Sequence, residues 1–295
     1  MRRTVSALAC PSLALLLASC GHSTATPTAS PLTELRLSAT GFMVGAAPQD
    51  LGGLGLTSDA PARHVVVTVR DDSGQVVTFN GTTYDPTGTG AATVELNSGN
   101  LFRRTLLLPS GTYTFENAVK DDATNATLLA YGPAAENAGT LTTTGGSVRL
   151  TAHAVMDPAS SVLAPTENVP QLFTDSTVNL ALSPKTAGVN GASATVPTSD
   201  ISAVTYSLGS PTDGVLNGAG SKVGVNVTAR GAADDTTLNV TASFSAWIRV
   251  AGTDTATFQS VSVSYAQGIA MYAVVQQAAP LMGFAPISGP PLNRG

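Results

Sequence analysis

From residue 32 onward the chain alternates apolar and polar positions in short segments separated by clusters of Gly, Pro, Asn and Asp. Such segments predict β-strands, because successive side chains of a strand point to opposite faces. The predicted apolar faces in the first half share one parity each and comprise Leu35, Leu37 and Ala39; Val65, Val67 and Val69; Ala92, Val94 and Leu96; Tyr113, Phe115 and Val119; and Val148, Leu150, Ala152 and Ala154. These strands predict one β-sandwich over residues 32–157.

A turn is predicted within this first sandwich at Asp71–Gly74, where Asp, Asp, Ser and Gly follow one another. These residue types favour tight turns through local side-chain hydrogen bonds and tolerance of positive φ. We therefore expect the strands 65–70 and 76–79 to form a hairpin.

The second half is predicted to form another sandwich, over residues 173–279, after a proline-containing linker at 158–172. Its predicted strands are 178–182, 203–208, 223–229, 238–250 and 255–265. In the last of these, the apolar parity switches between Phe258 and Val261, which predicts a β-bulge near Gln259. The strand count is typical of an immunoglobulin-like sandwich, although the cysteine pair of that fold is absent.

The predicted fold class is therefore all-β, with two tandem antiparallel β-sandwich domains, the first prealbumin-like and the second immunoglobulin-like. The run at 269–279 fits either a last strand or a short helix. Residues 280–295 are rich in Pro and Gly and predict a disordered tail.

The N-terminus has the pattern of an export signal. Arg2 and Arg3 precede an apolar run from Val5 to Ala18, which is too short to span a bilayer. Leu17, Ala18, Ser19 and Cys20 resemble the lipobox of bacterial lipoproteins. In that family the cysteine thiol takes a diacylglycerol, the signal (here 1–19) is cut before it, and the new amino terminus is acylated, with palmitate as the expected chain. The alternative is an ordinary signal peptide with Cys20 at its cleavage site by chance.

Several acyl chains on Cys20 would anchor the protein firmly, since a single chain binds a membrane only marginally. The Ser, Thr, Ala and Pro of residues 20–31 predict a flexible tether between this lipid and the first domain. Gly21 differs from the aspartate that retains Gram-negative lipoproteins on the inner membrane, so the resemblance implies the outer membrane in a cell with two membranes.

Residues 64–156 resemble the prealbumin-like, carboxypeptidase-regulatory-type sandwich of secreted proteins. The resemblance rests on the strand and hairpin of 65–79 and on the run from Leu108 to Phe115, which is similar to the "LPxGxYxF" strand entry of that family. The loop at 81–91 is longer than in the family. The resemblance implies an accessory or structural role and transfers no catalytic residue.

Composition narrows the expected function. Removal of Arg2 and Arg3 with the signal leaves 12 basic and 19 acidic residues, a net charge of about −7, and charged residues form only 11% of the chain. An acidic, charge-poor chain argues against a nucleic-acid partner, which requires a basic patch. The only cysteines are Cys10 and Cys20, so the mature domains have no disulfide and no thiolate chemistry.

No catalytic, metal or cofactor site is predicted. The histidines (His22, His64 and His153) are expected to be structural or solvated, because none is spaced with a second ligand. The Asp pairs at 71–72, 121–122 and 234–235 adjoin turn residues and lack the spacing of a calcium loop. No Gly-x-Ser-x-Gly elbow occurs, and the Asn-x-Thr triplets at Asn80, Asn125, Asn226 and Asn239 are expected by chance in a Thr-rich chain.

Trp247 is the candidate ligand contact, because its parity places it among polar residues of the strand 238–250. An exposed Trp beside hydroxyls could stack on a sugar or anchor a partner protein. The alternative is that Trp247 packs under a loop or against the first domain.

The expected function is a lipid-anchored, extracytoplasmic, non-enzymatic module that binds or scaffolds components of the cell envelope. Its expected partners are the membrane, through the lipid on Cys20, and an envelope protein or a glycan. The alternative is a carbohydrate-binding accessory lipoprotein.

Overall fold

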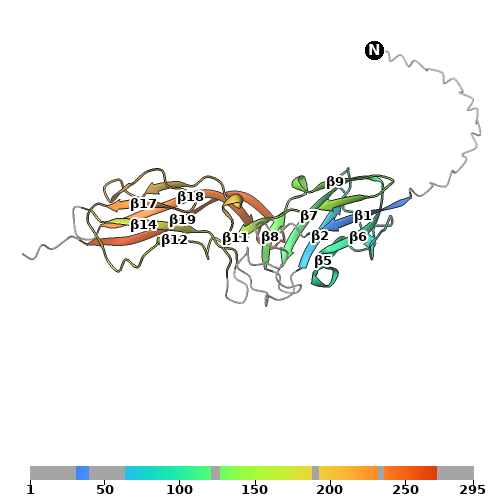
Figure 1. Ribbon diagram of the computed structural model, residues 1–295, viewed down its shortest axis with the longest axis horizontal. Helices are drawn as coiled ribbons and strands as arrows, with labels where there is room; N and C mark the ends of the chain where they lie inside the picture. The colour runs from blue at the N-terminus through green and yellow to red at the C-terminus, as the bar shows by residue number, and fades with distance from the viewer. Residues whose placement is uncertain (1–30, 40–63, 121–126, 188–192, 232–235, 271–295) are drawn as a thin grey trace, which may run out of the picture.

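The computed structural model describes residues 31–39, 64–120, 127–187, 193–231 and 236–270. Two β-sandwiches follow one another along the long axis of the molecule (Figure 1). Within the described residues every helical element is a single 3₁₀ turn, η2 (Ser98–Asn100), η3 (Ala134–Glu136) or η4 (Thr198–Asp200). The all-β class predicted from the alternating pattern is confirmed.

The first sandwich packs a five-stranded sheet, in the order β10-β1-β6-β4-β3, against part of a ten-stranded sheet. Its strands are β1 (Leu32–Ser38), β2 (His64–Arg70), β3 (Phe79–Asn80), β4 (Thr83–Tyr84), β5 (Thr93–Asn97), β6 (Arg103–Pro109), β7 (Gly111–Lys120), β8 (Leu128–Gly132), β9 (Ala138–Leu141) and β10 (Gly146–Arg149). The core between the sheets contains the inward positions that were predicted for β1, β2, β5 and β7, such as Leu35, Val67, Leu96 and Phe115. Ala92 is the exception; it precedes β5 and is exposed.

The predicted hairpin forms only in part. The turn is present, and the N–H of Val77 donates to the carbonyl of Val69 at 2.8 Å. Phe79 then begins β3 in the opposite sheet, where it pairs with Tyr84. The second arm therefore crosses the core instead of extending the hairpin, which buries the Phe79 ring between the two sheets.

The strand predicted to run through Val148, Leu150, Ala152 and Ala154 is two strands in different sheets. β10 pairs with β1, whereas β11 (His153–Met156) pairs with β8. The break lies at Thr151, whose N–H and carbonyl are bound by buried Asn side chains. Asn137 Oδ1 accepts from the Thr151 N–H at 2.6 Å, and the amides of Asn117 and Asn137 each donate to the Thr151 carbonyl at 3.1 Å.

The second sandwich packs the four-stranded sheet β12-β14-β17-β16 against the other part of the ten-stranded sheet. Its strands are β12 (Val162–Pro165), β13 (Leu172–Phe173), β14 (Thr177–Ser183), β15 (Thr205–Leu208), β16 (Gly214–Leu216), β17 (Gly224–Ala229), β18 (Thr237–Arg249) and β19 (Ala256–Ala270). The inward positions Leu238, Val240, Ala242, Phe244 and Ala246 of β18 are buried in its core, as their shared parity predicted.

The segment 158–172, interpreted from its prolines as a linker, belongs to the second sandwich. It contains β12, which pairs with β14 from Val162 to Pro165. Leu163 and Leu172 are buried in the second core together with Ala154 and Met156. Pro165 ends β12 and does not mark a linker. The chain passes from one sandwich to the other through β11, which pairs with strands of both.

The β-bulge predicted near Gln259 is absent. β18 and β19 pair without a register shift from Thr237 opposite Gly268 to Arg249 opposite Ala256. The apolar parity of β19 changes because the strand is longer than the sandwich. Val263 faces the second core, whereas Ala256 lies on the other face and joins a separate apolar cluster between the two sandwiches.

The sheets are mainly antiparallel, but β1 with β10, β4 with β6, β11 with β18 and β13 with β19 are parallel pairs. Of the run left open as strand or helix, residues 269–270 belong to β19. Residues 271–279, the predicted tail 280–295, the predicted signal and the predicted tether up to residue 30 lie outside the described residues.

Candidate functional site

Cys20, the predicted lipid attachment residue, lies outside the described residues. Among the residues that are described, no helix combines the length and the apolar character needed to cross a membrane. β1, the first described strand, begins at the end of the first sandwich that is remote from the second (Figure 1).

Trp247, the candidate ligand contact, packs against the first sandwich. Its ring lies parallel to the imidazole of His153, with a centroid separation of 5.0 Å and an interplanar angle of 9°. Its ring centroid also lies 5.9 Å from that of Tyr131 on β8 and 5.8 Å from that of Phe258 on β19, with both pairs of rings tilted. The structure thus shows the second of the two alternatives for Trp247, packing against the first domain.

Strand β11 joins the two sandwiches into one sheet. Its first half, His153 and Ala154, pairs antiparallel with β8 of the first sandwich. Its second half, Val155 and Met156, pairs in parallel with Trp247 and Ile248 of β18. The ten-stranded sheet is therefore continuous through both units, in the order β13-β19-β18-β11-β8-β7-β2-β5.

An apolar cluster covers this crossing strand on one face. It consists of Ala118, Leu128, Tyr131, Val155 and Ala256, with Trp247 packed against it. We call these residues together with His153 the junction. Because they come from β7, β8, β11, β18 and β19, rotation of one sandwich against the other would expose apolar surface to water.

His153 is held at the junction by one carboxylate from each sandwich. Its Nε2 lies 2.7 Å from Glu136 Oε2 on η3, and its Nδ1 lies 3.2 Å from Asp200 Oδ1 on η4. Asp200 is fixed in turn, because its Oδ2 accepts the N–H of Ala154 at 2.8 Å. Both ring nitrogens face acceptors, so the fully protonated imidazolium satisfies the site best.

The pKa of His153 reflects two opposed effects. Partial burial disfavours the charged ring and lowers the pKa, but the hydrogen bonds to Glu136 and Asp200 and their negative charges raise it. The net result is a pKa above the ordinary value of 6.5. His153 was expected to be structural or solvated, and it is a half-buried bridge between the two sandwiches.

Polar contacts surround the junction. Lys120 at the end of β7 forms an ion pair with Asp254, which Arg249 of β18 also contacts at 3.4 Å. The hydroxyl of Tyr131 donates to Glu116 at 2.9 Å, and burial together with this bond raises the pKa of Tyr131 to about 12. The charges near the junction are therefore bound to one another.

The other predicted polar residues show ordinary structural roles where they are described. Asp71 Oδ1 accepts from the N–H groups of Ser73 at 3.0 Å and Gln75 at 2.9 Å, which is the turn chemistry expected for that pair. His64 begins β2, with its Nδ1 at 4.0 Å from Glu95 Oε2. Across the ranges that the structure describes, no group of three or more His, Cys, Asp or Glu side chains is arranged to hold a metal.

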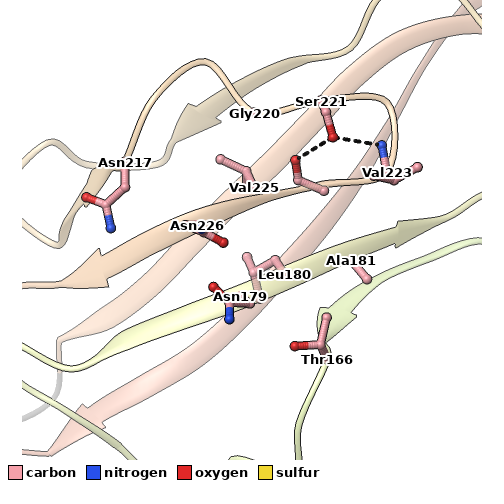
Figure 2. Close-up of a pocket in the computed structure, with 11 residues that line it drawn as sticks. Thr166, Asn179, Leu180, Ala181, Asn217, Gly220, Ser221, Val223, Val225 and Asn226 are labelled. Carbon is pink, nitrogen blue, oxygen red and sulfur yellow. Dashed lines mark hydrogen bonds between the residues drawn. The ribbon is translucent and has the colours of Figure 1, made fainter.

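A second polar feature is an open groove on the outer face of the second sandwich (Figure 2). It has a volume of about 340 Å³ and runs over β14 and β17 to the turn that precedes β17. The groove is lined by Thr166, Asn179, Leu180, Ala181, Asn217, Gly220, Ser221, Val223, Gly224, Val225 and Asn226. None of these residues is charged.

Three asparagines line this groove: two on strands and Asn217 in the bend after β16. Asn179 of β14 and Asn226 of β17 are direct cross-strand partners, and both are exposed. The N–H of Asn217 donates to the Asn226 carbonyl at 2.8 Å, and its side-chain amide donates to Thr228 at 2.9 Å. Among the described residues, the amides of Asn179 and Asn226 have no hydrogen-bond partner.

The sequence interpretation gave packing of Trp247 against the first domain as an alternative, but it missed the other residues of the junction and the whole groove. The parity of β14 and β17 could have placed Asn179 and Asn226 on the outer face of the sheet, because each lies between two inward-facing apolar residues. Asn179 and Asn226 are 47 residues apart, so their pairing depends on the register of strands remote in sequence, which the sequence pattern does not reveal. The approach of Glu136 and Asp200 to His153 has no local signal at all.

The comparisons with known proteins give no family for the chain. No family model matches it, and no curated protein matches it. A search of solved structures finds human CDH23 EC21-23, with 13% sequence identity, a TM-score of 0.19, and coverage of 80% of this chain and 72% of that one. This TM-score is too low to bear on the fold, which is established by the strand pairing and the two apolar cores.

Proposed function

We propose that this protein is a lipid-anchored component of the bacterial cell envelope whose two sandwiches form a single stiff arm for binding or scaffolding. The lipid is proposed on Cys20 from the lipobox-like run at 17–20. The arm would stand on the extracytoplasmic side, on the outer membrane in a cell with two membranes. Its partners would be the membrane, through the lipid, and an envelope protein or a glycan.

The observation that supports this proposal best is the continuous sheet through β11. Domains joined by a flexible linker move independently unless their interface is large and apolar. Here one strand pairs with both sandwiches, and Trp247 and Tyr131 close the space between them. A stiff connection suits a protein that must hold a binding surface at a set distance from a membrane.

The direction of the arm also supports the proposal of an anchored binding or scaffolding protein. The strands of the second sandwich run along the long axis, and β1 lies at the opposite end of the molecule (Figure 1). β19 alone has 15 residues, which corresponds to about 50 Å at the rise of a β-strand. A lipid near β1 would place the groove of the second sandwich far from the bilayer.

The role is proposed as non-enzymatic because the titratable groups that meet at the junction bind one another. His153 is occupied by Glu136 and Asp200, and Lys120 by Asp254. A catalytic group would need a reacting atom within hydrogen-bond reach, and these contacts occupy the atoms concerned.

Replacement of Cys20 by Ser tests the anchor. We expect Cys20→Ser to appear in the soluble extracytoplasmic fraction or as an uncleaved precursor, whereas the wild type fractionates with membranes. Unchanged membrane retention of Cys20→Ser would contradict the lipid anchor.

A pull-down tests the binding role. The mature chain, extracted in detergent, is incubated with envelope fractions, and bound material is identified after washing. Retention of a specific envelope component supports the proposal. No retained component, together with turnover of an envelope polymer by the purified protein, would replace it with an enzymatic function.

The second candidate function is a carbohydrate-binding accessory lipoprotein. Trp247 suggested this function from the sequence, but its ring packs against His153 and Tyr131 in the junction. The observation that now favours this candidate is the uncharged groove with its unpaired asparagine amides.

A further inference from the structure

We infer that the groove over β14 and β17 is a binding site for a neutral polysaccharide, with the amides of Asn179 and Asn226 as its principal hydrogen-bonding groups. The inference rests on the proposed binding function and names the ligand class and the site.

The amides are suited to sugar hydroxyls. Each Asn side chain offers two N–H donors and a carbonyl acceptor on one planar group. Directly opposite residues in an antiparallel pair have Cβ atoms about 5 Å apart, so the two amides can contact neighbouring hydroxyls of one sugar ring. Because Asn179 and Asn226 lack partners among the described residues, a ligand would not have to break protein contacts there.

The absence of charge from the lining favours a neutral ligand. Lys222, the charged residue of the turn that borders the groove, is directed elsewhere: its Nζ donates to the carbonyls of Thr198 at 2.8 Å and Ile201 at 2.6 Å. A polyanion would find no cation in the lining and would meet a mature chain whose 12 basic and 19 acidic residues give a net charge of about −7. Phosphorylated or uronic-acid polymers are therefore disfavoured.

The groove also offers apolar surface for the C–H face of a sugar. Val223 is 63% exposed at the rim, and Ala181 lies in the lining below it (Figure 2). Binding sites generally combine such apolar contact with a few placed polar groups. The volume of about 340 Å³ is at the low end of the range for ligand sites, and the groove is open, which suits a short stretch of a longer chain.

The walls of the groove are fixed before any ligand binds. Ser221 Oγ accepts the N–H of Val223 at 3.3 Å and donates to the Gly224 carbonyl at 3.4 Å, which holds the turn closed. Gly224 has φ +156, and a Cβ there would lie 2.1 Å from the Leu180 carbonyl oxygen, so the turn packs directly on β14. Preorganisation of this kind lowers the entropic cost of binding.

The test measures glycan binding by the mature, detergent-extracted full chain. The probes are an array of neutral oligosaccharides (glucan, mannan, galactan and chitin oligomers) and a set of anionic ones of matched length. We expect binding of at least one neutral class and none of the anionic set. The double variant Asn179→Ala/Asn226→Ala should weaken that binding at least tenfold.

Asn239→Ala is the matched control, because Asn239 is an exposed asparagine on an outward face of β18 in the same sandwich and outside the groove. It should bind within twofold of wild type. A thermal melt of each variant verifies folding, and Asn179→Asp/Asn226→Asp, which keeps the side-chain shape but removes amide donors, should also lose binding.

Two results would overturn the inference: no neutral oligosaccharide binds, or binding persists unchanged in both double variants. If glycan binding fails while the wild type stays membrane-anchored through Cys20 and retains an envelope protein, only the ligand assignment is refuted. Loss of anchoring and of every envelope partner would refute the proposed function itself.

Discussion

Replacement of His153 by Gln is expected to uncouple the two sandwiches. The imidazole contacts Glu136 on one side and Asp200 on the other, and its face covers Trp247. We discount each charge-assisted hydrogen bond to about 1 kcal/mol because the site is partly solvated, and the ring stack contributes about another 1 kcal/mol. The variant should therefore lose about 3 kcal/mol of stability at about pH 6, where the imidazole is protonated and both carboxylates are ionised.

The pH dependence has a definite sign. The pKa of His153 is raised in the folded protein above its ordinary value of 6.5, so the folded state binds the proton more tightly than the unfolded state. The stabilisation by His153 is then complete below about pH 6.5 and is lost as the pH rises through the raised value. Wild type should thus lose stability relative to His153→Gln as the pH rises above 6.5 and through the raised pKa of His153.

Two measurements check this prediction. Calorimetry at each pH should show one coupled transition for wild type at about pH 6, and lower or separated transitions for His153→Gln. Because Trp247 is the only tryptophan of the chain, its fluorescence reports on the junction and should change with pH in wild type but not in the variant. Equal pH profiles for wild type and His153→Gln would refute the bridging role of the imidazolium.

Three further substitutions test other parts of the structure. Trp247→Ala should cost about 2–3 kcal/mol by opening the junction, since the ring is only partly buried, and denaturant unfolding followed by circular dichroism would measure it; a loss below about 0.5 kcal/mol would contradict the packing role. Gly132→Ala should destabilise the fold strongly, because a Cβ there would lie 2.1 Å from both Asn117 Nδ2 and the Thr151 carbonyl oxygen. Gly268→Ala is the control and should be nearly neutral, because a Cβ there would have no atom within 4 Å. Equal melting temperatures for the two variants would be inconsistent with this packing. Tyr113→Phe should cost about 1 kcal/mol through loss of the 2.8 Å bond from its hydroxyl to the Pro109 carbonyl, and an unchanged denaturation midpoint would argue against that bond.

Several features of the fold could be predicted from local pattern. The parity of β18 identified its buried positions from Leu238 to Ala246, because side-chain direction alternates regardless of which strands lie alongside. The turn at Asp71 was also predictable, since its hydrogen bonds join residues two and four apart. Such features depend on neighbours along the chain.

Other features depended on strands that are remote in sequence. Parity gave Ala256 and Phe258 a face different from that of Val261. It could not distinguish a bulge from a strand that extends beyond its sandwich and reaches the apolar cluster of the junction. The break at Thr151 depends on Asn117, 34 residues away, and on Asn137, 14 residues away. Trp247 was correctly placed on the polar face, and only the arrival of β8 and β11 decided that this face is covered there.

The sequence by itself determined the all-β class, the buried faces of strands such as β2 and β18, and the expectation of a lipid on Cys20, because each follows from residues close together in the chain. The tertiary structure decided that the two sandwiches share one sheet, that His153 bridges them, and that Asn179 and Asn226 meet in an uncharged groove. These outcomes depend on strand register and on carboxylates brought from loops 17 and 47 residues away. Contacts of that kind form only when the whole chain is packed, since no local pattern encodes which strands become neighbours.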